Sequence, residues 1–303
     1  MKRTFVTSTL AMALLGVAAC KGGGADSAKL IPDTATVVGG LDVAAIVKSE
    51  SYTTNKEMIE KGDGKEMLDA ATACNIGLDK WKTITFGMDP TKSAFAAVVN
   101  ADGIGKEENL TCMHGKIKEK QGKDPWTVED KDGKKVLTME DGSVGYIVNE
   151  GSIVVASKDW SAGVKDLIDG KGKSVFDGAL KDVIARADTG KTMWAAGTLP
   201  ADMLKGSPAD GAKDAAGSVD LSDGVAIAAS VGFADAAAAT AKKDELQAQF
   251  DQMKAMAGTM GIPQTVVDSV KIDASGNAVT VSVKANKEET KQIQDGVMKQ
   301  MGG

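Results

Sequence analysis

The sequence has little of what most enzymes and nucleic-acid-binding proteins rely on. Its 303 residues include one histidine, His114, three cysteines and only 4% aromatic residues. Arginine occurs only at Arg3 and Arg186, and 42 acidic residues outnumber 36 basic ones. Nucleic acids and anionic surfaces are recognised by positively charged, arginine-bearing faces. We therefore expect no nucleic acid among the partners of this chain.

Motifs for catalysis are also missing. No Gly-x-Ser-x-Gly, Ser-x-x-Lys, Cys-x-x-Cys or His-Glu-x-x-His pattern occurs, so the common signatures of hydrolases, thiol redox proteins and zinc proteases are absent. His114 stands in a lysine-rich stretch, where a surface or capping role is expected. The sequence predicts no catalytic residue, no metal site and no cofactor. An enzyme with an unrecognised carboxylate site is the weaker alternative.

The N-terminus has the pattern of an export signal. Lys2 and Arg3 form a short positive region, residues 5–17 are mostly apolar and uncharged, and small residues lead up to Cys20. An apolar segment of this length, flanked in this way, is typical of a cleaved signal and too short for a stable membrane span. We expect residues 1–19 to be removed. An ordinary secretory signal that happens to contain a cysteine is the alternative.

The segment Val17-Ala18-Ala19-Cys20, preceded by Leu15-Gly16, resembles the lipobox of bacterial lipoproteins. That resemblance implies cleavage by the lipoprotein signal peptidase (signal peptidase II) and a diacylglycerol thioether on Cys20. An acyl chain such as palmitate on the new amine usually follows. Two or three acyl chains suffice for stable membrane anchoring. Apart from the lipobox, the chain resembles uncharacterised bacterial exported proteins, from which no function carries over.

The residues after Cys20 suggest how the anchor is joined to the folded part. In residues 20–32, Cys20 is followed by Lys21 and three glycines, a composition typical of a flexible tether. In the lipoprotein family an aspartate directly after the cysteine tends to retain the protein at the inner membrane. Lys21 therefore favours the outer membrane, with the protein facing the periplasm of the cell envelope.

The two remaining cysteines form an even pair. With Cys20 assigned to lipid, Cys74 and Cys112 are left in an oxidising compartment, where disulfides form and persist. We predict a disulfide between them. Two free thiols and a metal site are the alternatives, and a single nearby histidine fits zinc-ligand spacing poorly.

The mature chain reads as two related halves of an α+β fold, residues 33–172 and 190–303, joined by a helical connector at 173–189. Residues 36–40 parallel residues 193–197, and residues 95–99 parallel residues 225–229. Residues 147–155 align without a gap with residues 272–280. In each half we expect antiparallel strands packed by helices, including helices near 160–168, 236–257 and 287–298.

The first half carries an additional feature. Asp132-Gly133, Asp141-Gly142 and Glu150-Gly151 recur every nine residues between β-rich runs. Asp-Gly favours tight hairpin turns, because the central residues of those turns need positive φ. Residues 126–157 are therefore predicted to form a four-stranded antiparallel meander.

Methionines in the C-terminal quarter give a weaker indication. Leu246, Phe250 and Met253 follow the spacing of one buried helix face, and Met256 and Met260 come soon after. Methionine adapts to irregular apolar surfaces and is over-used at promiscuous binding sites, but it also fills ordinary cores. Phe250, Met253, Met256 and Met260 are the candidate lining of a hydrophobic ligand groove.

These observations favour a non-enzymatic envelope lipoprotein that binds or scaffolds an envelope protein partner, attached to the membrane through lipid on Cys20. A periplasmic carrier of lipid or another hydrophobic ligand is the alternative from a different class.

Overall fold

The computed structural model describes residues 24–60, 65–131, 134–200, 204, 209–254, 257 and 261–302, and it shows an α+β fold built on a twelve-stranded antiparallel sheet. The strands are β1 (Val37–Asp42), β2 (Trp81–Asp89), β3 (Ala94–Ala101), β4 (Thr127–Lys131), β5 (Lys134–Thr138), β6 (Val144–Asn149), β7 (Ser152–Ala156), β8 (Met193–Thr198), β9 (Asp214–Asp220), β10 (Val225–Gly232), β11 (Lys271–Ser275) and β12 (Ala278–Ala285).

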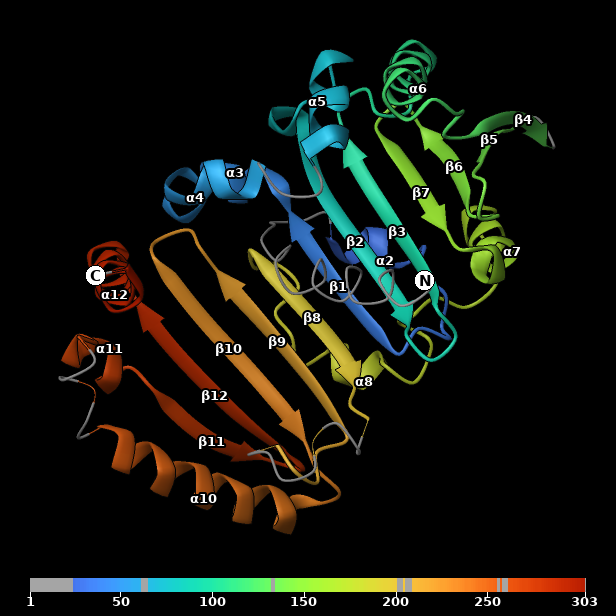
Figure 1. Ribbon diagram of the computed structural model, residues 1–303. Coiled ribbons are helices and arrows are strands. Elements are labelled where there is room, and N and C mark those ends of the chain that lie inside the picture. The colour runs from blue at the N-terminus through green and yellow to red at the C-terminus, as the bar shows by residue number, and fades with distance from the viewer. Residues whose placement is uncertain are drawn as a thin grey trace, which may run out of the picture.

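Helices lie at the ends and on both faces of this sheet (Figure 1). They are α2 (Gly24–Ala28), α3 (Val43–Lys48), α4 (Glu50–Glu60), α5 (Lys65–Ala73), α6 (Glu107–Gln121), α7 (Lys158–Ile168), α8 (Lys181–Ile184), α10 (Ala236–Lys254), α11 (Gln264–Asp268) and α12 (Lys287–Gly302). The helices expected near 160–168, 236–257 and 287–298 correspond to α7, α10 and α12.

The order of elements repeats between the two halves. In the first, the meander β1-β2-β3 is followed by α6 and by a hairpin, β6–β7, that returns beside β3. In the second, the meander β8-β9-β10 is followed by α10 and by the hairpin β11–β12, which returns beside β10. This repetition confirms the predicted α+β fold of two related halves. The four-stranded meander is also confirmed, as β4 to β7, with Gly142 of its second turn at φ +81°. Asp132 and Gly133 of its first turn lie outside the described residues.

The two halves meet in the middle of the sheet. β1 pairs with β2 on one side and with β8 on the other, so the first strands of the halves lie side by side (Figure 1). Gly40 is directly opposite Trp194 in this pairing. A Cβ at Gly40 would lie 2.1 Å from Nε1 of Trp194, whose side chain is only 2% exposed. Glycine at this position therefore makes room for the indole ring across the junction.

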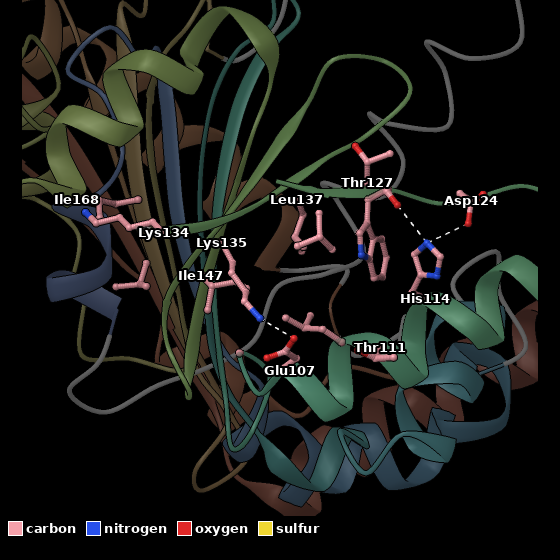
Figure 2. A pocket seen from close by; sticks show the side chains of 15 residues that line it. Glu107, Thr111, His114, Asp124, Thr127, Lys134, Lys135, Leu137, Ile147 and Ile168 are labelled. Carbon is pink, nitrogen blue, oxygen red and sulfur yellow. Dashed lines mark hydrogen bonds and ion pairs between the residues drawn. The ribbon is translucent and has the colours of Figure 1, made fainter. Parts of the chain in front are cut away.

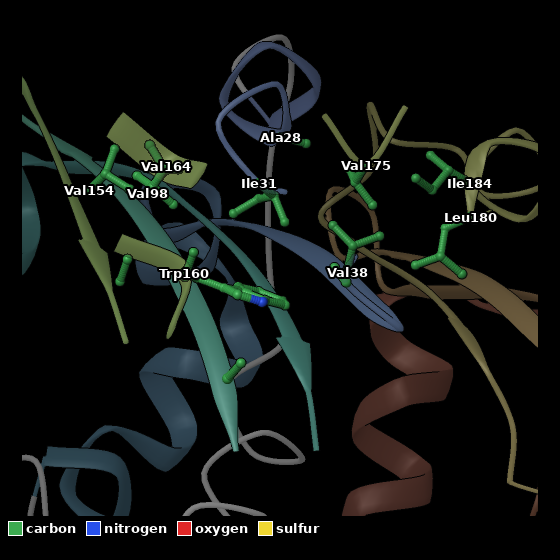
Figure 3. Packing of buried hydrophobic residues seen from close by; sticks show 14 of the residues in the cluster. Ala28, Ile31, Val38, Val98, Val154, Trp160, Val164, Val175, Leu180 and Ile184 are labelled. Atoms are coloured by element: carbon green, nitrogen blue, oxygen red, sulfur yellow. The ribbon is translucent and has the colours of Figure 1, made fainter. Parts of the chain in front are cut away.

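The main core lies on one face of the sheet, which we call the covered face. Val38, Val98 and Val154 point into it from the strands, and Trp160 and Val164 of α7 pack against them (Figure 3). Ala28 and Ile31, at and after the end of α2, are fully buried in the same cluster, and α8 adds Val183 and Ile184.

Three sequence expectations need correction. Residues 20–32 were expected to be a flexible tether, but α2 begins at Gly24, and Pro32 bridges to Ser174. The chain is fixed this early because Ala28 and Ile31 are apolar side chains buried in the core.

Within the connector, residues 173–189, α8 is a four-residue helix, because Val175 and Leu180 are drawn into the core from irregular backbone. On α10 the expected buried face is wrong at Met253, which is 61% exposed.

Gly40→Ala tests the junction between the halves. The new methyl group would overlap a tryptophan ring that has no room to move, and we expect a loss of about 1–3 kcal/mol in the free energy of unfolding. Gly115→Ala is the matched control, because a Cβ at this helical position would meet nothing within 4 Å. The control should gain up to about 1 kcal/mol from helix propensity. Urea unfolding of both variants measures the difference, and equal stabilities would contradict this account of the junction.

Candidate functional site

The face of the sheet opposite the covered face carries large apolar side chains that remain partly accessible. β2 shows the arrangement most clearly. Its small or polar residues Thr83, Thr85 and Gly87 are buried on the covered face, while Ile84, Phe86 and Met88 point to the other face and are only half-buried. The buried polar groups are satisfied there: Asn100 donates to Ser27 of α2 (2.8 Å) and to Thr83 (2.6 Å). The large apolar side chains of β2 therefore point away from the main core.

The register carries this pattern across the sheet, because residues directly opposite each other in antiparallel strands share a face. Phe86 is opposite Ala97, which is opposite Val155. In the second half Ile227 is opposite both Val219 and Val283. We call this surface the open apolar face. It comprises Val37, Ile84, Phe86, Met88, Phe95, Ala97, Val99, Ile153, Val155, Ala195, Val219, Ile227, Ala229, Val281 and Val283.

Helices cover the margins of this face. Ala71 of α5 and Ile104, just before α6, pack near Val99 and Ile153 at one end. Ala45 and Ile46 of α3 pack near Met193. At the far end of the second half α10 packs on β11 and β12, through the cluster that contains Ala239 and Val279.

Between these margins the face stays accessible. Phe95 is 38% exposed and Ile227 is 41% exposed, and the other members, apart from the exposed Ala195, are half-buried. Contiguous apolar surface of this kind is uncommon on monomeric soluble proteins and marks sites of interaction.

At the outer end of the first half, a pocket of about 890 Å³ lies between α6 and the meander (Figure 2). Leu110 of α6 forms one wall, with the exposed Thr111 at its rim, and Leu137 and Ile147 of the meander form the opposite wall. Trp126, half-buried just before β4, closes the side nearest His114. The walls are mainly apolar, with polar groups at the rim.

Three attachments hold α6 over this pocket. Before its start, the Gly105 amide donates to the carbonyl oxygen of Glu150 in the β6–β7 turn (3.0 Å). Near its middle, Cys112 is joined to Cys74, just after α5, by a disulfide with a Cα–Cα distance of 5.6 Å. This confirms the predicted pairing. Further along, Nε2 of His114 lies 3.1 Å from the carbonyl oxygen of Trp126, and the two rings meet edge to face at 5.5 Å.

The charged side chains that line the pocket are all paired. Lys135 binds Glu107 (2.5 Å), and Lys134 binds Asp169 (2.5 Å). Asp124 accepts from Lys118 (2.9 Å) and lies 3.1 Å from Nε2 of His114. Hydrogen bonds from Lys134 and then Lys165 lower the pKa of Asp169 to about 2, so its carboxylate stays ionised and ties α7 to the meander.

Of the predicted site residues, the structure brings Cys74 and Cys112 together and places Phe250 and Met253 on α10. Cys20, Met256 and Met260 lie outside the described residues. Phe250 is half-buried and Met253 is exposed on α10, so the methionine groove stays a prediction. Sequence reasoning missed the open apolar face and the pocket. The alternation of β2 was the signal available for the face, since Ile84, Phe86 and Met88 alternate with Thr83, Thr85 and Gly87.

In the part of the chain that the structure describes, no group of three or more histidine, cysteine, aspartate or glutamate side chains is placed to hold a metal ion. No helix among these same residues has the length and apolar character needed to cross a membrane.

Removing the disulfide tests how firmly α6 is held. In the chain-entropy model, a bridge that closes a loop of this length (38 residues apart in sequence) stabilises the fold by ~4 kcal/mol. The double variant Cys74→Ala/Cys112→Ala should lose a comparable amount in urea unfolding, and reduction of the wild-type protein should reproduce the loss. Cys20→Ala is the control and should keep wild-type stability. A double variant as stable as the control would show that the bridge contributes nothing.

Comparison with known proteins finds similarity in structure only. No protein-family model and no curated protein matches the chain. Among solved structures the chain is similar to TP0453. Crystal form III gives a TM-score of 0.55 at 9% sequence identity, covering 88% of this chain and 96% of that chain. Crystal form I gives a TM-score of 0.52 at 9% identity, covering 90% and 97%. At such low identity the similarity shows that this chain shares the fold of TP0453 over nearly its whole length.

Proposed function

We propose that this chain is a cell-envelope lipoprotein, anchored by lipid on Cys20 and facing the periplasm, which binds a hydrophobic ligand on its open apolar face without catalysing a reaction. One observation carries the proposal: the strands direct Phe86, Phe95 and Ile227 to an accessible surface instead of the main core. Water contact with apolar surface costs about 25 cal/mol per Å², and a bound apolar molecule would relieve that cost.

The composition of the face favours a lipid-like ligand over a protein partner. Its members are aliphatic residues, alanines, two phenylalanines and one methionine, Met88. The residues that dominate binding energy at protein–protein interfaces are mostly tryptophan, tyrosine and arginine, and none of these belongs to the face. The one arginine of the mature chain, Arg186, pairs with Asp214 between α8 and β9, beside the covered face.

A scaffolding role for an envelope protein partner is the second candidate. The edge strand β4 favours it, because all five of its residues are exposed and an edge strand leaves backbone groups free to pair with another chain.

The anchor is tested in the native host. Cells grown with radioactive palmitate should yield a labelled protein in the membrane fraction, because the lipobox resemblance implies an acylated Cys20. Cys20→Ala should carry no label. Wild-type protein that takes up no label and leaves the cells in soluble form would refute the anchor, while leaving ligand binding open.

Ligand binding is tested on the mature chain carrying Cys20→Ser, with the fluorescent apolar probe N-phenylnaphthylamine. Phe95→Asn/Ile227→Asn places two amides on the open apolar face at positions already exposed. Each lost apolar contact is worth about 1.4 kcal/mol or more, so the dissociation constant should rise at least about tenfold.

Two matched variants interpret that result. Met67→Asn removes a methionine that is 50% exposed on α5, outside the open apolar face, and should bind the probe like wild type. Met253→Asn tests the methionine groove of α10. If Met253→Asn weakens binding while Phe95→Asn/Ile227→Asn does not, the ligand site lies on α10 and the open apolar face is excluded.

A further inference from the structure

The pocket beneath α6 lies where the two halves differ in how the helix after the first three strands is held. In the second half α10 packs directly on β11 and β12, and Ala239 is fully buried against this layer. In the first half the two extra strands β4 and β5 widen the sheet, and α6 is tied to α5 and to Trp126 instead. The helix therefore stands off the meander and leaves a half-open pocket, whereas α10 at the corresponding place of the second half lies against its strands.

The size and walls of this pocket suit a small organic molecule. Its volume, about 890 Å³, falls in the range of roughly 300–1,000 Å³ that is typical of small-molecule sites. Leu110, Leu137 and Ile147 offer an apolar interior, and Trp126 offers an aromatic face. Thr111 and Thr127, both exposed, supply hydroxyl groups at the rim.

The charges at the rim decide which kind of molecule fits. Each charged side chain at the rim is ion-paired: Glu107 with Lys135, Lys134 with Asp169, and Asp124 with Lys118 and His114. Because each rim charge already faces an opposite charge, the described part of the rim presents no unpaired charge of either sign that would attract an ion. A charged group brought against the apolar walls would also lose its hydration, which costs binding free energy. An uncharged ligand meets no such cost.

We propose that the pocket beneath α6 is a binding site for an uncharged amphiphile, a molecule with one alkyl chain and hydroxyl or ester oxygens. The chain lies against Leu110, Leu137 and Ile147, and the oxygens reach the threonine hydroxyls at the rim. This site is additional to the open apolar face and does not depend on ligand binding there.

The test compares three probes of equal chain length on the mature chain carrying Cys20→Ser, each below its micelle concentration. They are 1-monolauroylglycerol, laurate and dodecylammonium, and binding is followed by calorimetry and by tryptophan fluorescence. The neutral probe should bind at least about tenfold more tightly than either ion, and Trp126→Phe should remove most of its fluorescence response. Equal affinities for the neutral and the charged probes would overturn the assignment of an uncharged ligand.

Filling the pocket locates the site. Thr111→Trp places a large ring at the rim of the pocket, where the proposed ligand enters, and should weaken the binding of 1-monolauroylglycerol at least about tenfold. Thr240→Trp, at an exposed position on α10, is the matched control and should bind like wild type. Thr127→Trp fills the pocket from its other side, should Thr111→Trp not fold. Unchanged binding in folded pocket variants, with loss in Phe95→Asn/Ile227→Asn, would overturn the pocket site and leave the open apolar face as the only site.

Discussion

The antiparallel pairing of β1 with β8 is the constraint on which the rest of the structure depends. Each half alone would end in an edge strand at this position, and the pairing turns two related sheets into one. Two adjacent glycines of β1 serve the two faces at this junction. Gly40 admits the ring of Trp194 on the covered face, and Gly39 admits the ring of Phe86 on the opposite face. Because the register continues through the junction, the open apolar face runs without interruption from β7 to β12.

Helix placement then separates the roles of the two faces. α2, α7 and α8 bury the covered face, where threonine, glycine and valine are small enough to allow close packing. α3, α5, α6 and α10 reach only the margins of the other face. The largest core cluster thus lies on the covered face, smaller clusters lie under the helices at the margins of the opposite face, and the area between those margins is left available for binding. This division explains how a protein with few aromatic residues can bury a core and still present apolar surface.

The elements that the sequence predicts well are those with local causes. The turn chemistry of Asp141-Gly142 and Glu150-Gly151 located the strands of the meander, and the gapless match of residues 147–155 to 272–280 identified the duplicated hairpin. The pairing of Cys74 with Cys112 followed from having one even pair. Alternation along β2 could not show which of its faces the helices would cover, because that depends on where α2 and α7 dock. The pocket could not be predicted from the sequence for the same reason, because its walls come from three elements, α6, β5 and β6, whose packing is not local.

The early docking of α2 has a consequence for where the protein can act. Gly24 is already part of the folded body, so only three residues separate it from Cys20. Fully extended, four residue steps span about 14 Å, roughly half of the ~30 Å hydrocarbon thickness of a bilayer. If Cys20 carries lipid as proposed, this short tether keeps the folded domain close to the membrane surface. Any cargo would then be passed to or from a mobile second component that comes to this protein.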